Sequence, residues 1–424
     1  MATARVGADS PDGGSRRAGT TARKRANHAR SDFRANRLRL LQTLLEEGPS
    51  TRARLCDETG LSRATVSALT NHFLRDGTVV ERTSNTTPSR AGGRPPMLVR
   101  LAAQAGVVVG VGAAAQRDLM ICVASLGHEV LRSVTAPGIR PDESVHNRIA
   151  TLGDLIRDAV EGAGLDIGED VLGVSLGVAA PVTGPLGRLP QAGIDPYGQV
   201  PAPAESLTVR LGVPVVQEND ANLGALAEGE WGAAKGANSY IYLLTGYGVG
   251  AGLVLDGALL RGAWGTAGEI GHVPVRKDGE QCRCGNRGCL DTVAGGGYLV
   301  TRLAAQGLDV SSPDDVVHLA VEGNPLARAA LDESAEELGT VLAGVLNLLN
   351  PERVVVGGAF AADPAYLDRL RERVAERTLR AAQDNLTLVP GSLGQAATAL
   401  GGVAYLIRQP ARTNVAARLR TLAT

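Results

Sequence analysis

The sequence predicts an α/β protein that begins with a small segment of three helices and two strands. The chain has 424 residues, more than one hydrophobic core usually serves, and this length favours two or three domains. From residue 101 onward, short strand-like apolar runs, such as 171–178 and 240–245, alternate with helical segments, such as one near 220–231, as in α/β folds. Gly246–Gly252 separates the run over 240–245 from another over 253–256. Before residue 101, helically spaced leucines are interrupted by glycine turns and followed by two strand-like runs.

The first 33 residues are rich in Gly, Ser, Ala, Arg and Asp and have no hydrophobic period. A segment of this composition buries too little apolar surface to order itself, so we expect a disordered basic arm. It contains no apolar run typical of a signal peptide. The sequence therefore predicts three parts: the arm over 1–33, a winged helix-turn-helix over 34–100, and an α/β body over 101–424.

The helices of the second part are indicated by their caps and their stops. Leucines at helical spacing precede a break at Gly48. Thr51, or Ser50 before it, can cap a second helix that ends at Gly60, and Ser62 can cap a third that ends near residue 77. The remaining elements are strand-like runs over 79–81 and 98–101 that flank a polar loop over 82–96.

A helix-turn-helix of this form presents one face of its second helix to solvent. Val66 and Leu69 anchor that helix inward, and the polar loop adds a flexible cationic segment suited to a minor groove or to phosphates. The residues predicted to contact DNA are Arg63, Ala64, Thr65, Ser67 and Asn71 on the helix and Arg90 and Arg94 in the loop. The alternative is a helix-turn-helix that makes protein contacts.

Charge is distributed unevenly along the chain. Residues 1–100 contain 18 Lys and Arg against 9 Asp and Glu, a net charge of +9, whereas the remainder carries −10. This asymmetry is expected when one end of a protein meets a polyanion such as DNA. A solvated basic tail would give the same asymmetry.

Five cysteines, three of them within eight residues, are too few and too clustered for a secreted disulfide framework. We therefore expect a reduced, cytoplasmic setting without a membrane span. His272, Cys282, Cys284 and Cys289 lie within 18 residues, and three thiolates with one imidazole suit tetrahedral zinc. Because protein would fill all four positions, we expect the zinc to be structural.

Four motifs in the body resemble the ROK family of repressors and sugar kinases. Their order and spacing match from about residue 101 to the end, and the preceding helix-turn-helix resembles the regulator branch of that family. The motifs are Glu218–Asn222, Thr245–Gly252, Ala267–His272 and Cys282–Cys289.

This resemblance implies a two-lobed, actin-like or RNase H-like sugar-kinase fold with a sugar in the cleft between the lobes. The family's sugar-binding positions carry over to Asn219, Asp220, Glu269 and His272, and His272 would also ligate zinc. Asp291 stands where the cysteine motif of the family usually has Glu, and we assign it to the ligand set. Solvated or capping carboxylates are the alternative for Asp220, Glu269 and Asp291.

The resemblance also implies that kinase chemistry is lost. Asp220 stands at the position of the family's general base, but the first phosphate loop departs from the pattern Asp-x-Gly-Gly-Thr: residues 110–116 read Gly-Val-Gly-Ala-Ala-Ala-Gln. Alanines lack the hydroxyl and the backbone freedom with which such a loop holds phosphate. We therefore expect no catalytic residue, with Asp220 a vestige.

Together these features predict a sugar-responsive DNA-binding transcriptional regulator, a repressor of carbohydrate-metabolism genes. Its expected partners are an operator, a small sugar effector and a second copy of the chain, as a homodimer or a dimer of dimers. The alternatives are a ROK-type sugar kinase with a DNA-binding appendage, and a constitutive DNA-binding protein with a vestigial pocket.

Overall fold

The computed structural model describes residues 33–83, 95–112, 118–138, 143–183 and 203–424. The predicted arm over 1–33, except Phe33, lies outside this set. The chain divides into two compact units: residues up to Ala105 together with 417–424, and residues 106–416. Among the described residues, every helix is too short or too polar to cross a membrane.

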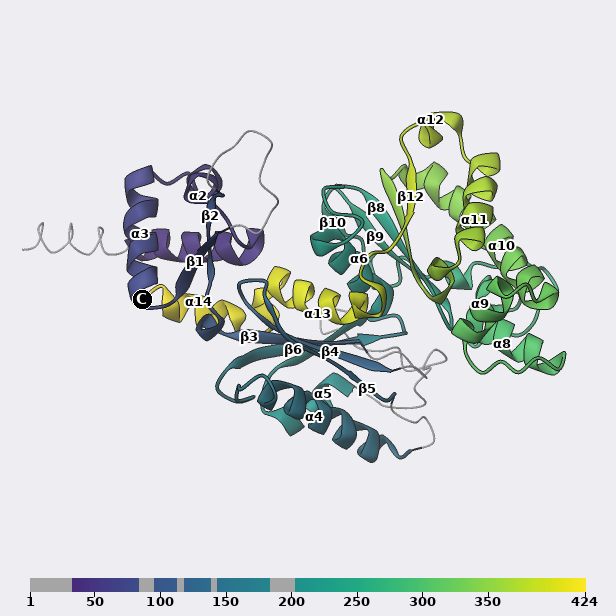
Figure 1. The fold of residues 1–424 in the computed structure, drawn as a ribbon, viewed down its shortest axis with the longest axis horizontal. Coiled ribbons are helices and arrows are strands. Elements are labelled where there is room, and N and C mark those ends of the chain that lie inside the picture. Colours follow the sequence, from purple (N-terminus) through teal and green to yellow (C-terminus); the bar gives the residue numbers. More distant parts are fainter. Residues whose placement is uncertain (1–32, 84–94, 113–117, 139–142, 184–202) are drawn as a thin grey trace, which may run out of the picture. The chain divides into compact units, whose positions relative to one another are not determined.

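The part of unit 1 over residues 33–101 contains three helices and a two-stranded antiparallel sheet (Figure 1). The first helix, over 33–47, buries its leucines at positions 40, 41, 44 and 45. Thr51 caps α2 (Arg52–Thr59), which ends at Gly60 with φ +68°, and Ser62 caps α3 (Arg63–Arg75). Because only glycine adopts positive φ without strain, Gly60 fixes the turn between the two helices. The sheet pairs β1 (Val79–Thr83) with β2 (Met97–Leu101).

The last eight residues of the chain belong to unit 1, although the sequence analysis placed them in the body. They include most of α14 (Val415–Leu422), whose Leu419 is buried. Arg418 donates hydrogen bonds to the carbonyl oxygens of Gln104 and Ala105, at 2.9 and 3.0 Å. Leu422 accepts another at 3.1 Å from Arg37 in the first helix. These contacts are between residues more than 300 positions apart, which a local pattern does not reveal.

Unit 2 contains two five-stranded sheets with the same topology. In each, three antiparallel strands are followed by two parallel ones, so the unit is built from two similar halves. The first sheet has the order β5 (Val130–Ala136), β4 (Leu119–Ser125), β3 (Val107–Gly112), β6 (Val171–Val178), β7 (Val215–Asn219). The second has the order β10 (Ala258–Leu259), β9 (Val249–Leu255), β8 (Tyr240–Thr245), β11 (Arg353–Gly358), β12 (Thr387–Pro390).

Helices cover both faces of each sheet. The outer face of the first sheet packs on α4 (Val145–Glu161) and α5 (Pro203–Leu211). One face of the second sheet shares a large apolar core with α8 (Gly296–Ala305), α9 (Pro313–Val321), α10 (Pro325–Leu349) and α11 (Pro364–Arg377). The other face packs on α6 (Asp220–Trp231). This layered α/β arrangement confirms the predicted fold class.

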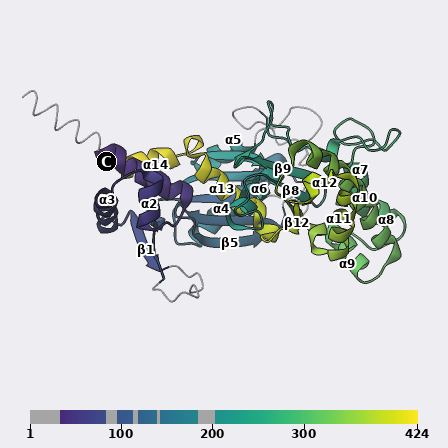
Figure 2. The ribbon, with the colours of Figure 1, turned by 90° about the horizontal axis from the view of Figure 1, so that it is seen from above.

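The helix α13 (Ala397–Arg408) lies against β3 and β6 on one side and against α6 on the other, and Figure 2 shows it running over the first sheet. Glycines permit the close approach. A Cβ on Gly110 of β3 would lie 1.9 Å from the carbonyl oxygen of Ala399, and one on Gly401 would lie 1.9 Å from that of Leu223. Backbones in such contact leave no room for side chains, so α13 and α6 join the two halves.

The predicted bounds of β6, β8 and α6 match the structure, but β9 does not. The sequence pattern predicts that Gly246–Gly252 separates two strands, whereas β9 begins at Val249. Its glycines serve packing: a Cβ on Gly252 would lie 2.4 Å from the carbonyl oxygen of Ala221 in α6. The remaining elements are the short helices η1 (Ala103–Ala105), η2 (Ile270–His272), α7 (Asp291–Ala294), η3 (Ala359–Ala362), α12 (Arg380–Gln383), η4 (Gly394–Ala396) and η5 (Pro410–Arg412).

Candidate functional site

A pocket of about 280 Å³ lies in unit 2 where parallel strands of both sheets end. Ligands in open α/β folds bind at the carboxyl ends of such strands, where loops and helix starts replace the sheet. The volume is near the lower end for small-molecule pockets and suits a small ligand. The polar or charged side chains on its wall are Asp118, Asn219, Asp220, Tyr242, Tyr247, Glu269, His272, Arg283, Asp314, Gln395 and Thr398.

Asn219 and Asp220 occupy the junction between β7 and α6. The side chain of Asn219 caps the helix by accepting a hydrogen bond from the backbone N–H of Asn222 at 3.1 Å, and it donates to the carbonyl oxygen of Ala180 at 3.3 Å. Its position is therefore fixed by the backbone. The amide retains one N–H for a ligand.

Two carboxylates on the wall have raised pKa values. Burial raises the pKa of Asp220 to about 6, although the positive charge of Arg283 opposes this shift. Burial, followed by the negative charge of Asp220, raises the pKa of Glu269 to about 7. These groups change protonation near neutral pH, and both can accept hydrogen bonds from hydroxyl groups.

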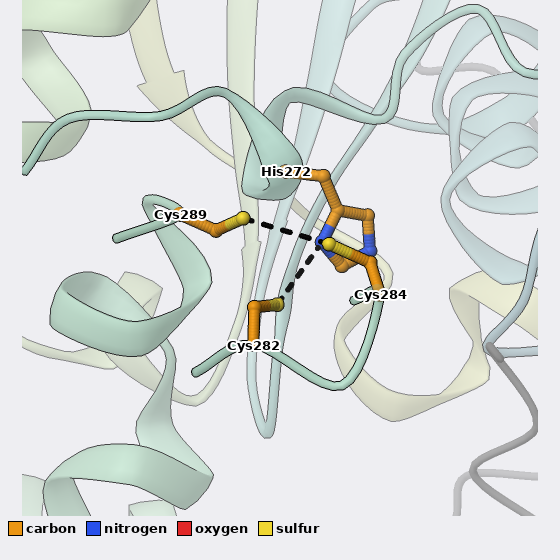
Figure 3. Close-up of side chains that lie close together, drawn as sticks. All are labelled: His272, Cys282, Cys284 and Cys289. Carbon is orange, nitrogen blue, oxygen red and sulfur yellow. Dashed lines mark hydrogen bonds between the residues drawn. The ribbon is translucent and has the colours of Figure 1, made fainter. Parts of the chain in front are cut away.

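His272 joins the pocket to a cluster of three cysteines, shown in Figure 3. Its Nδ1 atom lies 3.6 Å from Sγ of Cys282, and Sγ of Cys284 lies 3.6 Å from Sγ of Cys289. All four ligand atoms are within 4.8 Å of one another. The Nε2 atom of His272 faces the other way, 3.9 Å from a carboxylate oxygen of Glu269.

The cluster fits a tetrahedral metal ion. An ion about 2.3 Å from each sulfur and about 2.0 Å from the nitrogen requires its ligand atoms to be about 3.5–3.8 Å apart. The two separations of 3.6 Å agree with that requirement, and the other pairs of ligand atoms lie within 4.8 Å of one another. The chain returns to complete the cluster through Gly288, where φ is +66° and a Cβ would lie 1.8 Å from the carbonyl oxygen of Arg276.

Asp291 does not line the pocket, contrary to the predicted ligand set. One of its oxygens accepts a hydrogen bond from the backbone N–H of Val249 at 2.9 Å, and the other lies 3.4 Å from Nη2 of Arg283. Asp291 therefore holds the first residue of β9 and the guanidinium of Arg283. The other four predicted ligand residues do line the pocket.

Arg283 is a wall residue that the sequence analysis missed. It lies between the first two cysteines of the motif, where neither periodicity nor spacing distinguishes a pocket side chain from a solvated one. Its positive charge opposes the raised pKa values of both Asp220 and Glu269. Its proximity to two pocket carboxylates depends on the fold of the cysteine loop.

In unit 1, α3 presents the face predicted to contact DNA. Arg63, Ala64 and Asn71 are exposed, and Thr65 and Ser67 are half-buried, while Val66, Leu69 and Phe73 form the inner face. Ser62 accepts a hydrogen bond from the backbone N–H of Thr65 at 3.1 Å. Arg90 and Arg94 lie outside the described residues.

The family models match the two units separately. The ROK family model matches residues 109–409, and a model described as winged helix-turn-helix DNA-binding matches residues 33–80. The first match covers well over half of the chain. Its limits agree with unit 2, and those of the second match fall within unit 1.

Curated relatives align over nearly their whole length. A xylose repressor of Caldicellulosiruptor bescii is 31% identical over 389 residues, covering 88% of this chain and 95% of the relative. The xylose repressor of Bacillus subtilis is 29% identical, covering 87% and 94%. The DNA-binding transcriptional dual regulator NagC of Escherichia coli is 26% identical, covering 85% and 89%.

Solved structures give the same assignment. A ROK family transcriptional regulator, a homologue of the E. coli MLC protein, aligns with a TM-score of 0.69 and 25% identity over 92% of this chain and 98% of that one. A ROK family glucokinase from Streptomyces griseus aligns with a TM-score of 0.60 and 28% identity over 72% of this chain and all of the enzyme. The chain therefore belongs to the ROK family, and it joins a ROK domain to an N-terminal winged helix-turn-helix.

Proposed function

We propose that this protein is a sugar-responsive transcriptional repressor. The observation that carries the proposal is the combination, in one chain, of an exposed recognition helix, α3, with a polar pocket on a ROK scaffold. A DNA-reading surface and a small-molecule pocket are the two sites that a ligand-controlled regulator requires. Several full-length relatives are named sugar repressors, which supports the same role.

The effector that suits the pocket is a neutral monosaccharide. Its hydroxyl groups both donate and accept hydrogen bonds, and the wall offers carboxylates at Asp220 and Glu269, an amide at Asn219 and an imidazole at His272. These groups are held on strand ends and helix starts. Three of the relatives found are named xylose repressors, so xylose is the first sugar to test.

The cysteine cluster would hold zinc as a structural ion. Cys282, Cys284, Cys289 and Nδ1 of His272 supply the three thiolates and one imidazole that zinc prefers. With Nδ1 committed to the ion, Nε2 of His272 would carry the ring proton and face the pocket, where it could donate to a sugar oxygen. Zinc would thus fix the orientation of an effector-binding side chain.

The protein would not transfer phosphate. Residues 113–115 are alanines where sugar kinases of the family have glycines and a threonine, and the transition state for phosphoryl transfer depends on such a loop for positioning and charge stabilisation. Residues 113–117 lie outside the described part of the chain, so this argument rests on sequence. One observation favours the alternative of a sugar kinase: the raised pKa of Asp220, about 6, is what a general base requires.

Effector binding would alter operator affinity through a change in the spacing of two recognition helices in a dimer. A dimer that reads successive major grooves needs its recognition helices about 34 Å apart, so a small rigid-body change is sufficient. Coupling of about 1–3 kcal/mol would change operator affinity about 5- to 150-fold.

Fluorescence anisotropy tests the proposal directly. A duplex from upstream of the protein's own gene is titrated with the full-length protein at fixed salt, alone and with xylose, glucose or N-acetylglucosamine. We expect tight binding that one sugar weakens. Arg63→Ala should abolish operator binding without changing the sugar affinity measured by calorimetry. Operator binding that no sugar changes would support a constitutive DNA-binding protein.

Phosphate release from ATP, measured with the same sugars, tests the kinase alternative. We expect no sugar-dependent release. Turnover that increases with sugar and disappears in Asp220→Asn would establish a kinase with a DNA-binding appendage.

A further inference from the structure

Arg52 connects three elements of the winged helix-turn-helix. It is the first residue of α2, and its Nε atom donates to Glu81 of β1 at 2.8 Å. Its Nη2 atom donates to Oδ1 of Asn71 at 2.9 Å, and its Nη1 atom donates to Oγ of Ser67 at 3.4 Å. Ser67 and Asn71 are four residues apart on α3, within the face that the sequence predicts to contact DNA.

Glu81 holds the guanidinium in this position. The side chains of Arg52 and Glu81 are only 32% and 23% exposed, so their ion pair is more protected than a typical surface pair. The backbone of Glu81 is fixed in turn by the pairing of β1 with β2. Of the five N–H donors of Arg52, three are used within the protein and two remain for a phosphate.

The chemistry of arginine decides how its two partners on α3 are oriented. A guanidinium has only donors, so any group that it contacts must act as an acceptor. The amide of Asn71 must therefore turn its oxygen toward Arg52, which directs its NH₂ away from that residue. Likewise Ser67 accepts through its oxygen, so its own hydrogen is free to be donated elsewhere.

We propose that Arg52 is a positioning residue that makes Ser67 and Asn71 hydrogen-bond donors toward DNA and thereby sets base preference at one position of each half-site. In the major groove, guanine offers two acceptors, O6 and N7, and thymine offers O4. Adenine pairs best with a free asparagine amide that both accepts from N6 and donates to N7. Because Arg52 donates to the amide oxygen and turns it toward α2, the amide is left to act toward DNA mainly as a donor, which favours guanine or thymine over adenine at the base opposite Asn71. This inference rests on the proposed function.

The test compares wild type with Arg52→Met. Selection from a pool of randomised duplexes with the full-length wild-type protein first defines the preferred half-site, and Asn71→Ala identifies the position that Asn71 reads. Anisotropy on duplexes changed at that position then gives relative affinities. We expect wild type to prefer guanine or thymine over adenine by about tenfold, and Arg52→Met to reduce this ratio to about twofold or less. In the Asn71→Ala background, Arg52→Met should not change the ratio further.

Arg54→Met is the matched control because Arg54 lies on the same helix but pairs with Glu47 and Glu58, away from α3. It removes the same charge and should leave the base preference unchanged. Thermal unfolding checks that both variants fold. If Arg52→Met is unfolded, Glu81→Met provides a second test. This variant keeps Arg52 but removes the carboxylate that anchors its guanidinium, so it should lower the ratio of affinities at the same base position.

Two results would overturn the inference. One is an Arg52→Met protein that binds every duplex more weakly by the same factor, because Arg52 would then contact only phosphate. The other is a wild-type preference for adenine opposite Asn71. A wild-type protein that enriches no sequence at all would instead contradict the proposed function.

Discussion

Arg261 donates two hydrogen bonds to one carboxylate oxygen of Glu218, from Nη2 at 2.6 Å and from Nε at 2.9 Å. The side chain of Glu218 is 4% exposed, and its other oxygen accepts hydrogen bonds at 3.0 Å from the backbone N–H of Asn219 and from the side chain of Asn222. Arg261 follows the second sheet and Glu218 belongs to the first, while the ring of Tyr405 in α13 lies 5.3 Å from the guanidinium. The pair therefore joins the two halves of unit 2, and Glu218 contacts Asn219 of the pocket wall.

Removing Arg261 should be costly, because it leaves a buried carboxylate without its counter-charge. We predict that Arg261→Met lowers the free energy of unfolding of unit 2 by about 3–5 kcal/mol and weakens effector binding, since Glu218 positions Asn219. Urea denaturation and calorimetry measure these effects. Arg157→Met removes an arginine of similar exposure that pairs with the exposed carboxylate of Asp154, and it should change neither. An Arg261→Met protein of unchanged stability would contradict the role of the pair.

Replacing Asp220 should make the protein more stable but unresponsive to the effector. Its pKa is raised to about 6, so the folded protein binds this proton more tightly than the unfolded chain. The stability contribution of Asp220 is therefore complete below its ordinary pKa near 3.8 and is lost as the pH rises through about 6. Above about pH 6 the buried negative charge of Asp220 destabilises the fold. Asp220→Asn removes that charge, so we predict that the free energy of unfolding rises by up to roughly 3 kcal/mol at pH 8.

The same variant should lose its response to the effector, because an amide replaces the carboxylate that accepts from sugar hydroxyls. For wild type, we expect sugar affinity to fall as the pH is lowered through about 6, where Asp220 becomes protonated. Calorimetry at pH 5 and pH 8 measures this change. Asp154→Asn, at an exposed carboxylate of α4, is the control. Equal sugar affinity in Asp220→Asn and wild type would exclude Asp220 from the binding site.

The cysteine cluster should contain zinc that stabilises unit 2. We predict about one zinc per chain by elemental analysis, and loss of both zinc and cooperative unfolding of unit 2 in Cys284→Ser. Cys56→Ser changes a cysteine of α2, outside the cluster, and should retain the metal. Stoichiometric zinc and normal thermal stability in Cys284→Ser would show that the ligand assignment is wrong.

Glu230 should contribute to acid stability. Burial opposes its ionisation, but the imidazole of His128, 3.6 Å away, and a hydrogen bond from Arg408 at 2.9 Å outweigh burial and lower its pKa to about 2. A carboxylate with a lowered pKa stabilises the fold above its ordinary pKa near 4.5, and this contribution is lost as the pH falls toward 2. We predict that Glu230→Gln is less stable by roughly 1–3 kcal/mol at pH 7, because solvent screens part of the interaction, and that its stability falls less between pH 4.5 and pH 2. Parallel stability curves for the two proteins over that range would contradict this role.

Local signals in the sequence predict much of the fold. Continuous apolar runs define β6 and β8, because strands covered on both faces need no polar alternation, and caps define α2 and α3. The start of β9 was predicted wrongly because its glycines resemble a loop. Gly252 instead lies against the backbone of α6, where a side chain would not fit. This contact involves an element distant in sequence, so the local pattern does not predict it.

For the candidate sites too, the sequence predicts some residues and not others. Contiguous motifs contain Asn219, Asp220, Glu269 and His272, which all line the pocket, and the resemblance of these motifs to the ROK family was sufficient to predict them as ligand residues. The arginines that organise the sites were not predicted, because their partners are remote in sequence: Arg52 pairs with Glu81, 29 residues away, and Arg261 with Glu218, 43 residues away. Ion pairs between residues so far apart in sequence can be identified only from the folded structure, which brings the two residues together.

The reciprocity of the two binding events tests the central claim most directly. If the pocket and α3 are energetically coupled, the operator must change the sugar dissociation constant by the same factor as the sugar changes the operator dissociation constant. Calorimetric titration of the effector sugar into the protein, with and without a saturating operator duplex, measures that factor. We predict a 5- to 150-fold weaker sugar affinity on DNA, matching the anisotropy result. A sugar affinity that is identical with and without the operator would contradict the account.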